Sequence, residues 1–171
     1  MDKKNKTIAV LGAAGATGQE VVSALLAKGY QVRAGVHNRN NFGVKPGLTI
    51  VKIDATKTDD QKKLLQGSDA VVSLLGHGRK TPPSMQQDAM KATLAAMQQH
   101  KITRIIMLTG TGDPERIQEG INAGVYYYLV KPAQDTLLKS VIESALRERR
   151  QKTELLSELH RHDGALDRKS T

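Results

Sequence analysis

Residues 7–26 read TIAVLGAAGATGQEVVSALL, and this stretch decides the fold. The apolar run over 7–12 predicts a short buried strand that ends at a glycine. A helix is expected over 17–28, where the apolar residues fall on one face: Val21, Val22, Leu25 and Leu26. A strand followed by a glycine-rich turn and a helix is how a βαβ unit begins, so the stretch predicts an α/β fold.

Three glycines in this turn, Gly12, Gly15 and Gly18, have the spacing of a dinucleotide-binding loop. In such a loop the first glycine permits a tight turn, the second lets the backbone approach a pyrophosphate, and the third allows close helix–strand packing. The N-terminus of the helix then offers unpaired N–H groups to the phosphates. The alternative is that the glycines serve the turn alone.

Strands and helices alternate along the rest of the chain. Further strands are predicted over 30–36, 48–54, 69–76, 104–110 and 125–130, and helices over 60–67, 84–100 and 134–160. Alternation of this kind implies parallel strands joined by right-handed crossovers. We therefore expect a three-layer, doubly wound, Rossmann-like sheet of six strands in the order 3-2-1-4-5-6. The expected organisation is a single domain over 1–160, with a frayed tail over 161–171.

The composition narrows the class of protein. A chain of 171 residues suits one domain, and it contains no cysteine, which excludes disulfides. No apolar run approaches the length of a membrane span, and the first residues lack the apolar core of a signal peptide. We expect a soluble, cytoplasmic protein that has no membrane partner and no metal site.

The formal net charge is +9, and residues 1–110 carry all of this excess, with 16 Lys and Arg against 7 Asp and Glu. A basic first part favours an anionic partner, such as a phosphorylated cofactor or a nucleic acid. Aromatic residues make up only 3% of the chain, which disfavours binding of single-stranded nucleic acid through stacked bases. Solubility alone is the alternative explanation of the charge.

The end of the second strand bears on the choice of cofactor. NAD-binding sites place an acidic residue there against the ribose 2′-hydroxyl, and this chain has none from Gln31 to Asn41. Basic side chains stand there instead, at Arg33, His37 and Arg39, and guanidinium groups suit a 2′-phosphate. NADP(H) is therefore the preferred cofactor, with a solvated basic loop as the alternative.

Residues 6–110 resemble the NmrA-like atypical short-chain dehydrogenase/reductases, a group that includes the flavin (biliverdin) reductases. The resemblance rests on VLGAAGATGQEVVSALLAKGYQVRAGV, KIDATKTDDQKKLLQGSDAVVSLLG and AMKATLAAMQQHKITRIIMLTG. It implies a bound dinucleotide and a role for each of the following. The pyrophosphate would be held by Gly12, Gly15, Ala16 and Thr17, and the 2′-phosphate by His37, Asn38 and Arg39. The adenine would be flanked by Asp54 and Ala55. The passage to the nicotinamide would be lined by Leu75, Gly76 and His77, with Thr109 nearby.

Residues 104–150 resemble the last part of a response-regulator receiver domain instead, through LTG and GINAGVYYYLVKP. The resemblance makes Thr109 the switch hydroxyl, Tyr128 the rotating aromatic residue and Lys131 the phosphate-contacting lysine. The acidic residues that a phospho-acceptor site needs after the first strand are absent. Tyr127 and Lys131 also match the Tyr-x-x-x-Lys pair of dehydrogenases, but on a strand four residues span about 13 Å, so this match is accidental.

The two resemblances meet in RIIMLTG, over 104–110. We interpret the chain as an engineered chimera of Rossmann and flavodoxin-like fragments, made to test their recombination. It would retain an NADP(H) site without native catalysis, and no catalytic residue is assigned. The alternatives are a protein with no activity and a residual NADPH-dependent, flavin-type reductase. An apolar stripe at the end of the last helix predicts a homodimer: Leu155, Leu156 and Leu159.

Overall fold

The computed structural model describes residues 6–76, 82, 84–109, 127–130, 137 and 140–144. The side chains of Thr109 and of residues 128–130 lie outside that description. The chain divides into two compact units, over residues 1–134 and 135–171. The expected single domain over 1–160, its tail and the leucines of the last helix involve residues beyond the described ranges, so these remain predictions.

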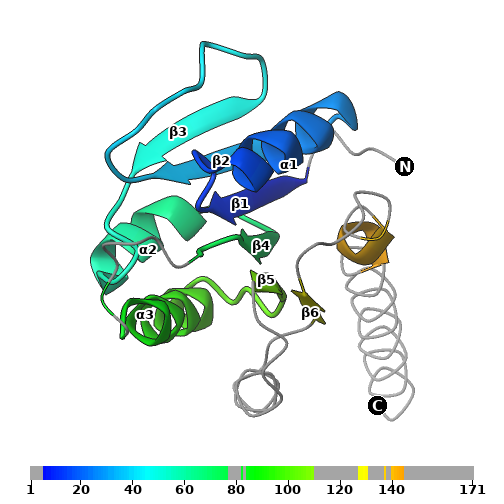
Figure 1. Cartoon of the computed structure of the whole chain (residues 1–171). Coiled ribbons are helices and arrows are strands. Elements are labelled where there is room, and N and C mark those ends of the chain that lie inside the picture. Colours follow the sequence, from blue (N-terminus) through cyan, green and yellow to red (C-terminus); the bar gives the residue numbers. More distant parts are fainter. Residues whose placement is uncertain are drawn as a thin grey trace, which may run out of the picture. The chain divides into compact units, whose positions relative to one another are not determined.

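The first unit is built on a parallel sheet of six strands, which Figure 1 shows in sequence colours. The strands are β1 (Thr7–Leu11), β2 (Gln31–Val36), β3 (Leu48–Lys52), β4 (Ala70–Ser73), β5 (Ile105–Thr109) and β6 (Tyr127–Val130). Their order in the sheet is β3-β2-β1-β4-β5-β6, which confirms the predicted topology. The chain order therefore reverses direction between β1 and β4.

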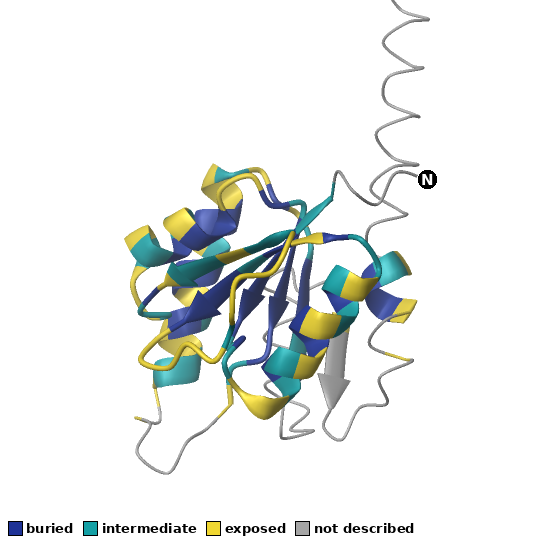
Figure 2. Cartoon of the chain, turned by 90° about the horizontal axis from the view of Figure 1, so that it is seen from above, coloured by how far each residue is buried: buried dark blue, intermediate teal, exposed yellow. Residues whose placement is uncertain are grey.

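Helices cover both faces of this sheet. They are α1 (Ala16–Ala27), α2 (Thr58–Leu65) and α3 (Met85–Gln99). Helix α1 packs on β1 and β2, while α2 and α3 pack on each other and on the opposite face. Figure 2 shows the central strands mostly in the buried colour, with the helices turning their exposed residues outward. The three-layer arrangement is the one that the sequence predicts.

Successive side chains of β1 explain why the sheet needs cover on both faces. All of Ile8, Ala9, Val10 and Leu11 are fully buried. Because side chains alternate along a strand, Ala9 and Leu11 join the core beneath α2 and α3, and the other two face α1. A strand that is apolar on both faces is stable only inside such a layered sheet.

The strands are a little shorter than the sequence predicts. Strand β4 ends at Ser73, although apolar residues continue to Leu75. Beyond Ser73 the backbone of Leu74 lies against the glycine turn, and the Leu74 side chain is buried. Tyr127 begins β6, which places the tyrosine of the Tyr-x-x-x-Lys match on a strand; Lys131 is outside the described residues.

Helices α1 and α3 end in the same way but with different residues. In both, the residue after the cap has a left-handed backbone: Gly29 has φ 84°, and Lys101 has φ 55°. The N–H that follows closes each end, from Tyr30 to the Leu25 carbonyl and from Ile102 to the Met97 carbonyl. This is the Schellman arrangement, for which glycine is suited because it has no Cβ.

We expect replacement of Lys101 by glycine to raise the free energy of unfolding by about 0.5–1 kcal/mol, because the left-handed conformation costs a lysine about 1–2 kcal/mol. Denaturant titration of the variant measures the change. As a control, Lys91→Gly places the same substitution within α3, where it should lower stability by about 1 kcal/mol. A Lys101→Gly protein that is less stable than the parent would contradict the strain at this position.

Candidate functional site

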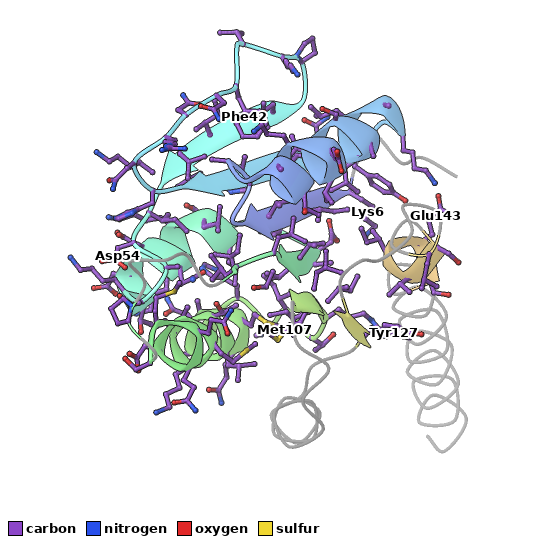
Figure 3. The ribbon with its side chains drawn as sticks, in the orientation of Figure 1. Lys6, Phe42, Asp54, Met107, Tyr127 and Glu143 are labelled. Atoms are coloured by element: carbon purple, nitrogen blue, oxygen red, sulfur yellow. The ribbon has the colours of Figure 1, made fainter. Side chains whose placement is uncertain are left out.

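The carboxyl ends of three adjacent strands meet where the sheet order reverses. Leu11 at the end of β1 pairs with Gly35 in β2 and with Ser73 in β4, so the three strands end nearly level. In Figure 3, Asp54 and Lys6 mark opposite ends of the strands, with Asp54 at the carboxyl end. Open α/β sheets bind ligands at such a reversal point, outside the carboxyl ends of the strands.

The turn after β1 depends on Gly12. Its φ is 72°, and a Cβ added there would lie 3.1 Å from the carbonyl carbon of Leu74. The segment that follows β4 therefore passes directly against this turn, and the Leu74 N–H donates to the Leu11 carbonyl at 3.0 Å. Gly12 is needed both for its backbone conformation and for this close approach.

The first turn of α1 presents a row of N–H groups. Gly15 precedes the helix with an extended backbone, and its carbonyl accepts the first helical hydrogen bond, from Gln19 at 2.9 Å. The N–H groups of Ala16, Thr17 and Gly18 come before that bond and so have no partner within the helix. The first turn carries no acidic side chain, which leaves its partial positive charge uncompensated.

Gly18 brings the helix against the turn. A Cβ at this position would lie 2.5 Å from the carbonyl oxygen of Ala13 and would also collide with the carbonyl of Gly12. Because both neighbours are backbone, nothing could rotate away. Gly18 therefore serves the close packing that the loop spacing predicts.

The basic side chains near β2 have two different surroundings in the structure. His37, Asn38 and Arg39 follow the strand and are exposed. Arg33 lies inside the strand, where its Nε donates to the Leu64 carbonyl at 2.8 Å and its Nη2 to the Lys63 carbonyl at 2.7 Å. Arg33 thus closes the C-terminal end of α2, which makes it a weaker candidate for a 2′-phosphate than sequence position suggests.

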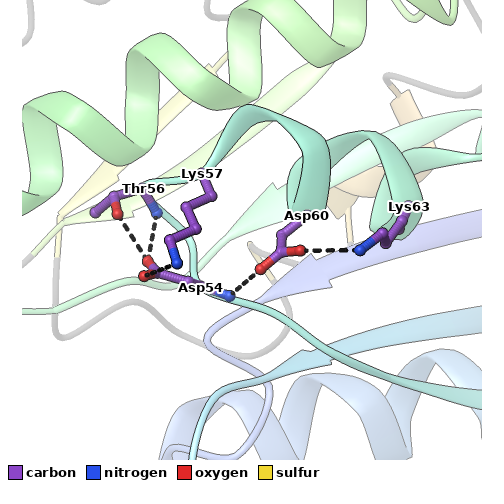
Figure 4. Close-up of polar contacts among 5 residues, drawn as sticks. All are labelled: Asp54, Thr56, Lys57, Asp60 and Lys63. Carbon is purple, nitrogen blue, oxygen red and sulfur yellow. Dashed lines mark hydrogen bonds and ion pairs between the residues drawn. The ribbon is translucent and has the colours of Figure 1, made fainter.

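Asp54 lies just beyond β3, in a small polar network shown in Figure 4. Its Oδ1 accepts hydrogen bonds from the Thr56 hydroxyl at 2.7 Å and the Thr56 N–H at 3.0 Å. Its own N–H donates to Asp60 Oδ2 at 2.9 Å, while Asp60 Oδ1 pairs with Lys63 at 3.3 Å. The Thr56 side chain is the main cause that lowers the pKa of Asp54, and the Asp54 N–H has the same effect on Asp60.

The backbone of the neighbouring Ala55 is held by a hydrogen bond from a buried side chain. Gln61 is fully buried, and its Nε2 donates to the Ala55 carbonyl at 2.8 Å. Sequence analysis named Asp54 and Ala55 but missed the residues that fix them: Thr56, Asp60 and Gln61. The aspartate-x-threonine spacing of a local turn was a usable signal for the first of these, whereas a buried glutamine gives none.

The remaining predicted residues lie around β4 and β5. Leu75 is half-buried and Gly76 is exposed, with open space where a Cβ would stand. Thr109 ends β5, and only its backbone is described. His77 falls outside the described residues. The structure therefore gathers the turn, Leu75 and Gly76 at one edge of the sheet, and the roles of His77 and the Thr109 hydroxyl remain predictions.

Within the described ranges, the chain offers neither a metal site nor a membrane-spanning helix. There, no group of three or more His, Cys, Asp or Glu side chains is placed to hold a metal ion. Across the same part of the chain, no helix combines the length and hydrophobicity that crossing a bilayer requires.

The glycine turn, the start of α1 and the strand order have the arrangement of a Rossmann-type fold, and the family comparison agrees with this. The sequence profile of the NAD(P)H-binding family matches residues 12–150, more than half of the 171-residue chain, and the chain belongs to this family. The match runs past residue 110, where sequence analysis placed a joint. None of the comparisons supports a receiver segment or an engineered origin.

A curated relative and several solved structures extend this comparison. An uncharacterized chloroplastic protein of Arabidopsis thaliana is 34% identical over 79 residues, which is 44% of this chain and 28% of that protein. A Rossmann-fold NAD(P)-binding family protein from Shigella flexneri has a TM-score of 0.58 at 21% identity, covering 72% of this chain and 64% of that one. The NAD complex of an Agrobacterium tumefaciens uronate dehydrogenase mutant has a TM-score of 0.54 at 20% identity, covering 60% and 40%.

These two solved structures share their fold with this chain. The chain spans about a quarter of the curated relative's length and between two fifths and two thirds of the two solved structures.

We expect Gly18→Ala to lower the free energy of unfolding by about 1–3 kcal/mol, because its Cβ meets backbone that cannot move aside. Thermal or denaturant unfolding measures this loss. The matched control is Gly15→Ser, which has an allowed backbone and only a 3.4 Å contact, and should be at least as stable as the parent. Equal stability of Gly18→Ala and the parent would contradict the close packing.

Replacing Thr56 by valine should raise the pKa of Asp54 towards its ordinary value of 3.8, because the hydroxyl hydrogen bond is the main cause that lowers it. Carboxyl carbon NMR, titrated with acid, measures the shift, and Thr49→Val, at an exposed position of β3, is the control. The lowered pKa stabilises the fold above pH 3.8, and this contribution disappears as the pH falls through the folded value. The variant should lose less stability over that range; an unchanged Asp54 titration would contradict the assignment.

Proposed function

We propose that this chain binds NADP(H) across the carboxyl ends of β1, β2 and β4, with the pyrophosphate at the N-terminus of α1. The observation that carries the proposal is the row of N–H groups at Ala16, Thr17 and Gly18, held open by the turn at Gly12 and Gly15. Phosphates bind at helix N-termini because those N–H groups and the helix dipole both favour negative charge. Membership of the NAD(P)H-binding family supports the same cofactor class.

The preference for the phosphorylated cofactor rests on the loop after β2. His37, Asn38 and Arg39 are exposed there, and the sequence from Gln31 to Asn41 contains no acidic residue to accept a hydrogen bond from a ribose hydroxyl. A guanidinium group pairs with phosphate in a forked geometry, whereas it gains little from a neutral hydroxyl. Arg39 is therefore the principal residue proposed to contact the 2′-phosphate, with His37 and Asn38 beside it.

The adenine is proposed to lie against Asp54 and Ala55, whose backbone is fixed by Asp60 and Gln61. Leu75 and Gly76 are proposed to border the nicotinamide. Reductase activity towards a flavin remains a hypothesis, since its candidate residues are chosen by position alone and their side chains lie outside those that the structure describes: His77, Thr109 and Thr111. A receiver-derived second half and an engineered origin are not part of the proposal, because one family profile matches across the joint.

Calorimetric titration with NADPH and with NADH tests the proposal. We expect NADPH to bind more tightly than NADH. The Arg39→Ser variant should have a lower affinity for NADPH and a nearly unchanged affinity for NADH. Gly15→Asp should reduce the affinity for NADPH by at least about tenfold, because a carboxylate would face the pyrophosphate across a short distance.

The Gly15→Asp variant is informative because it should fold at least as well as the parent: aspartate is a favoured residue before a helix. Gly15→Asn is its matched control, with nearly the same size and no charge, and should lose less affinity. If the folded parent binds neither nucleotide, the proposed function is wrong. If Gly15→Asp binds NADPH as the parent does, the pyrophosphate lies elsewhere.

A further inference from the structure

A hydrogen bond joins α3 to the segment that follows β4. Gln86, in the first turn of α3, donates from Nε2 to the Leu75 carbonyl at 3.2 Å. Both residues are half-buried. This bond spans the connection between β4 and α3, so it ties the end of the strand to the start of the helix.

The tied segment is the wall of the proposed cofactor crevice. Its preceding residue, Leu74, lies against the turn at Gly12, where a Cβ would come within 3.1 Å of the Leu74 carbonyl carbon. The contact with the turn fixes the segment on one side, and Gln86 holds it on the other. Gly76 follows directly and is exposed, and among the described residues other than its chain neighbours no heavy atom lies within 4 Å of where its Cβ would be.

The peptide group between Leu75 and Gly76 transmits this restraint. A trans peptide is planar, so the direction of its carbonyl determines the direction of its N–H. When Gln86 holds the Leu75 carbonyl, it therefore also sets which way the Gly76 N–H points. We propose that Gln86 is a positioning residue that orients the Leu75–Gly76 peptide for the nicotinamide half of the cofactor. This inference rests on the proposed function.

The bond is not needed to hold α3 in place. That helix is anchored by the side chains of its inner face: Ala89, Ala92, Thr93, Ala96 and Met97. Gln86 lies outside this set, and a single hydrogen bond contributes about 0.5–1.5 kcal/mol. A purely structural role would therefore appear as a small change in stability, whereas a positioning role appears as a selective change in cofactor affinity.

The test compares Gln86→Glu with Gln87→Glu. The two variants add the same charge to neighbouring positions at the start of α3, and Gln87 is exposed. Only the first removes the donor, because an ionised carboxylate cannot donate to the Leu75 carbonyl. Gln86→Met is the uncharged counterpart, which loses the donor but keeps the length of the side chain.

Two ligands separate the halves of the site, and calorimetry measures both. NADPH occupies the whole crevice, while adenosine 2′,5′-bisphosphate carries only the adenosine half with its phosphates. We expect Gln86→Glu and Gln86→Met to lower the affinity for NADPH by about 3- to 10-fold, the equivalent of one hydrogen bond. Their affinity for the bisphosphate should match the parent, and Gln87→Glu should match it for both ligands.

Each other outcome overturns a stated step. If the parent binds NADPH and both Gln86 variants bind it equally well, the positioning role is wrong and the proposed function stands. If the Gln86 variants lose as much affinity for the bisphosphate as for NADPH, the residue acts on the whole site and its assignment to the nicotinamide half is wrong. If the folded parent binds neither ligand, the proposed function fails, and this inference fails with it.

Discussion

The close contact between Gly18 and the carbonyls of Gly12 and Ala13 is the constraint on which the rest of the site depends. It brings the start of α1 down onto the turn after β1, so the unpaired N–H groups of the helix lie at the carboxyl edge of the sheet. A larger side chain would push helix and turn apart, because both collision partners are backbone. The same turn touches Leu74 in the segment directly after β4, so one small loop lies between β1, α1 and the end of β4.

Helix α2 is held in a comparable way, from its C-terminal end. Arg33 donates to the Lys63 and Leu64 carbonyls, and His100 Nε2 lies 3.0 Å from the Lys62 carbonyl. The Lys62 carbonyl also accepts from the Gln66 N–H at 3.1 Å. Carbonyls in the last turn of a helix lack helical partners, and basic side chains are suited to them. Fixing this end places the start of α2, and with it the Asp54 loop, beside the end of β2. A basic residue of β2 thus shapes the site indirectly.

The family match gives this architecture a cofactor class, NAD(P)H, and the loop after β2 gives the proposal its preference for the phosphorylated form. The phosphate end is the most completely built part of the site, because its groups are backbone and are fixed by the turn. The adenine side is built from side chains that hold one another, Thr56 on Asp54 and Gln61 on Ala55. At the nicotinamide side the described wall is the Leu75–Gly76 segment, tied to α3 by Gln86.

The sequence by itself determined the sheet order, the layered α/β fold and the glycine turn, because apolar periodicity and glycine spacing act locally and leave a trace in consecutive residues. It did not show that Arg33 closes α2, although His37 and Arg39 follow β2 as expected. It also gave no sign that Gln61 and Gln86 hold Ala55 and Leu75. Such hydrogen bonds join residues whose proximity exists only after the strands have aligned, so the tertiary structure alone decided which polar groups serve the site and which serve the fold.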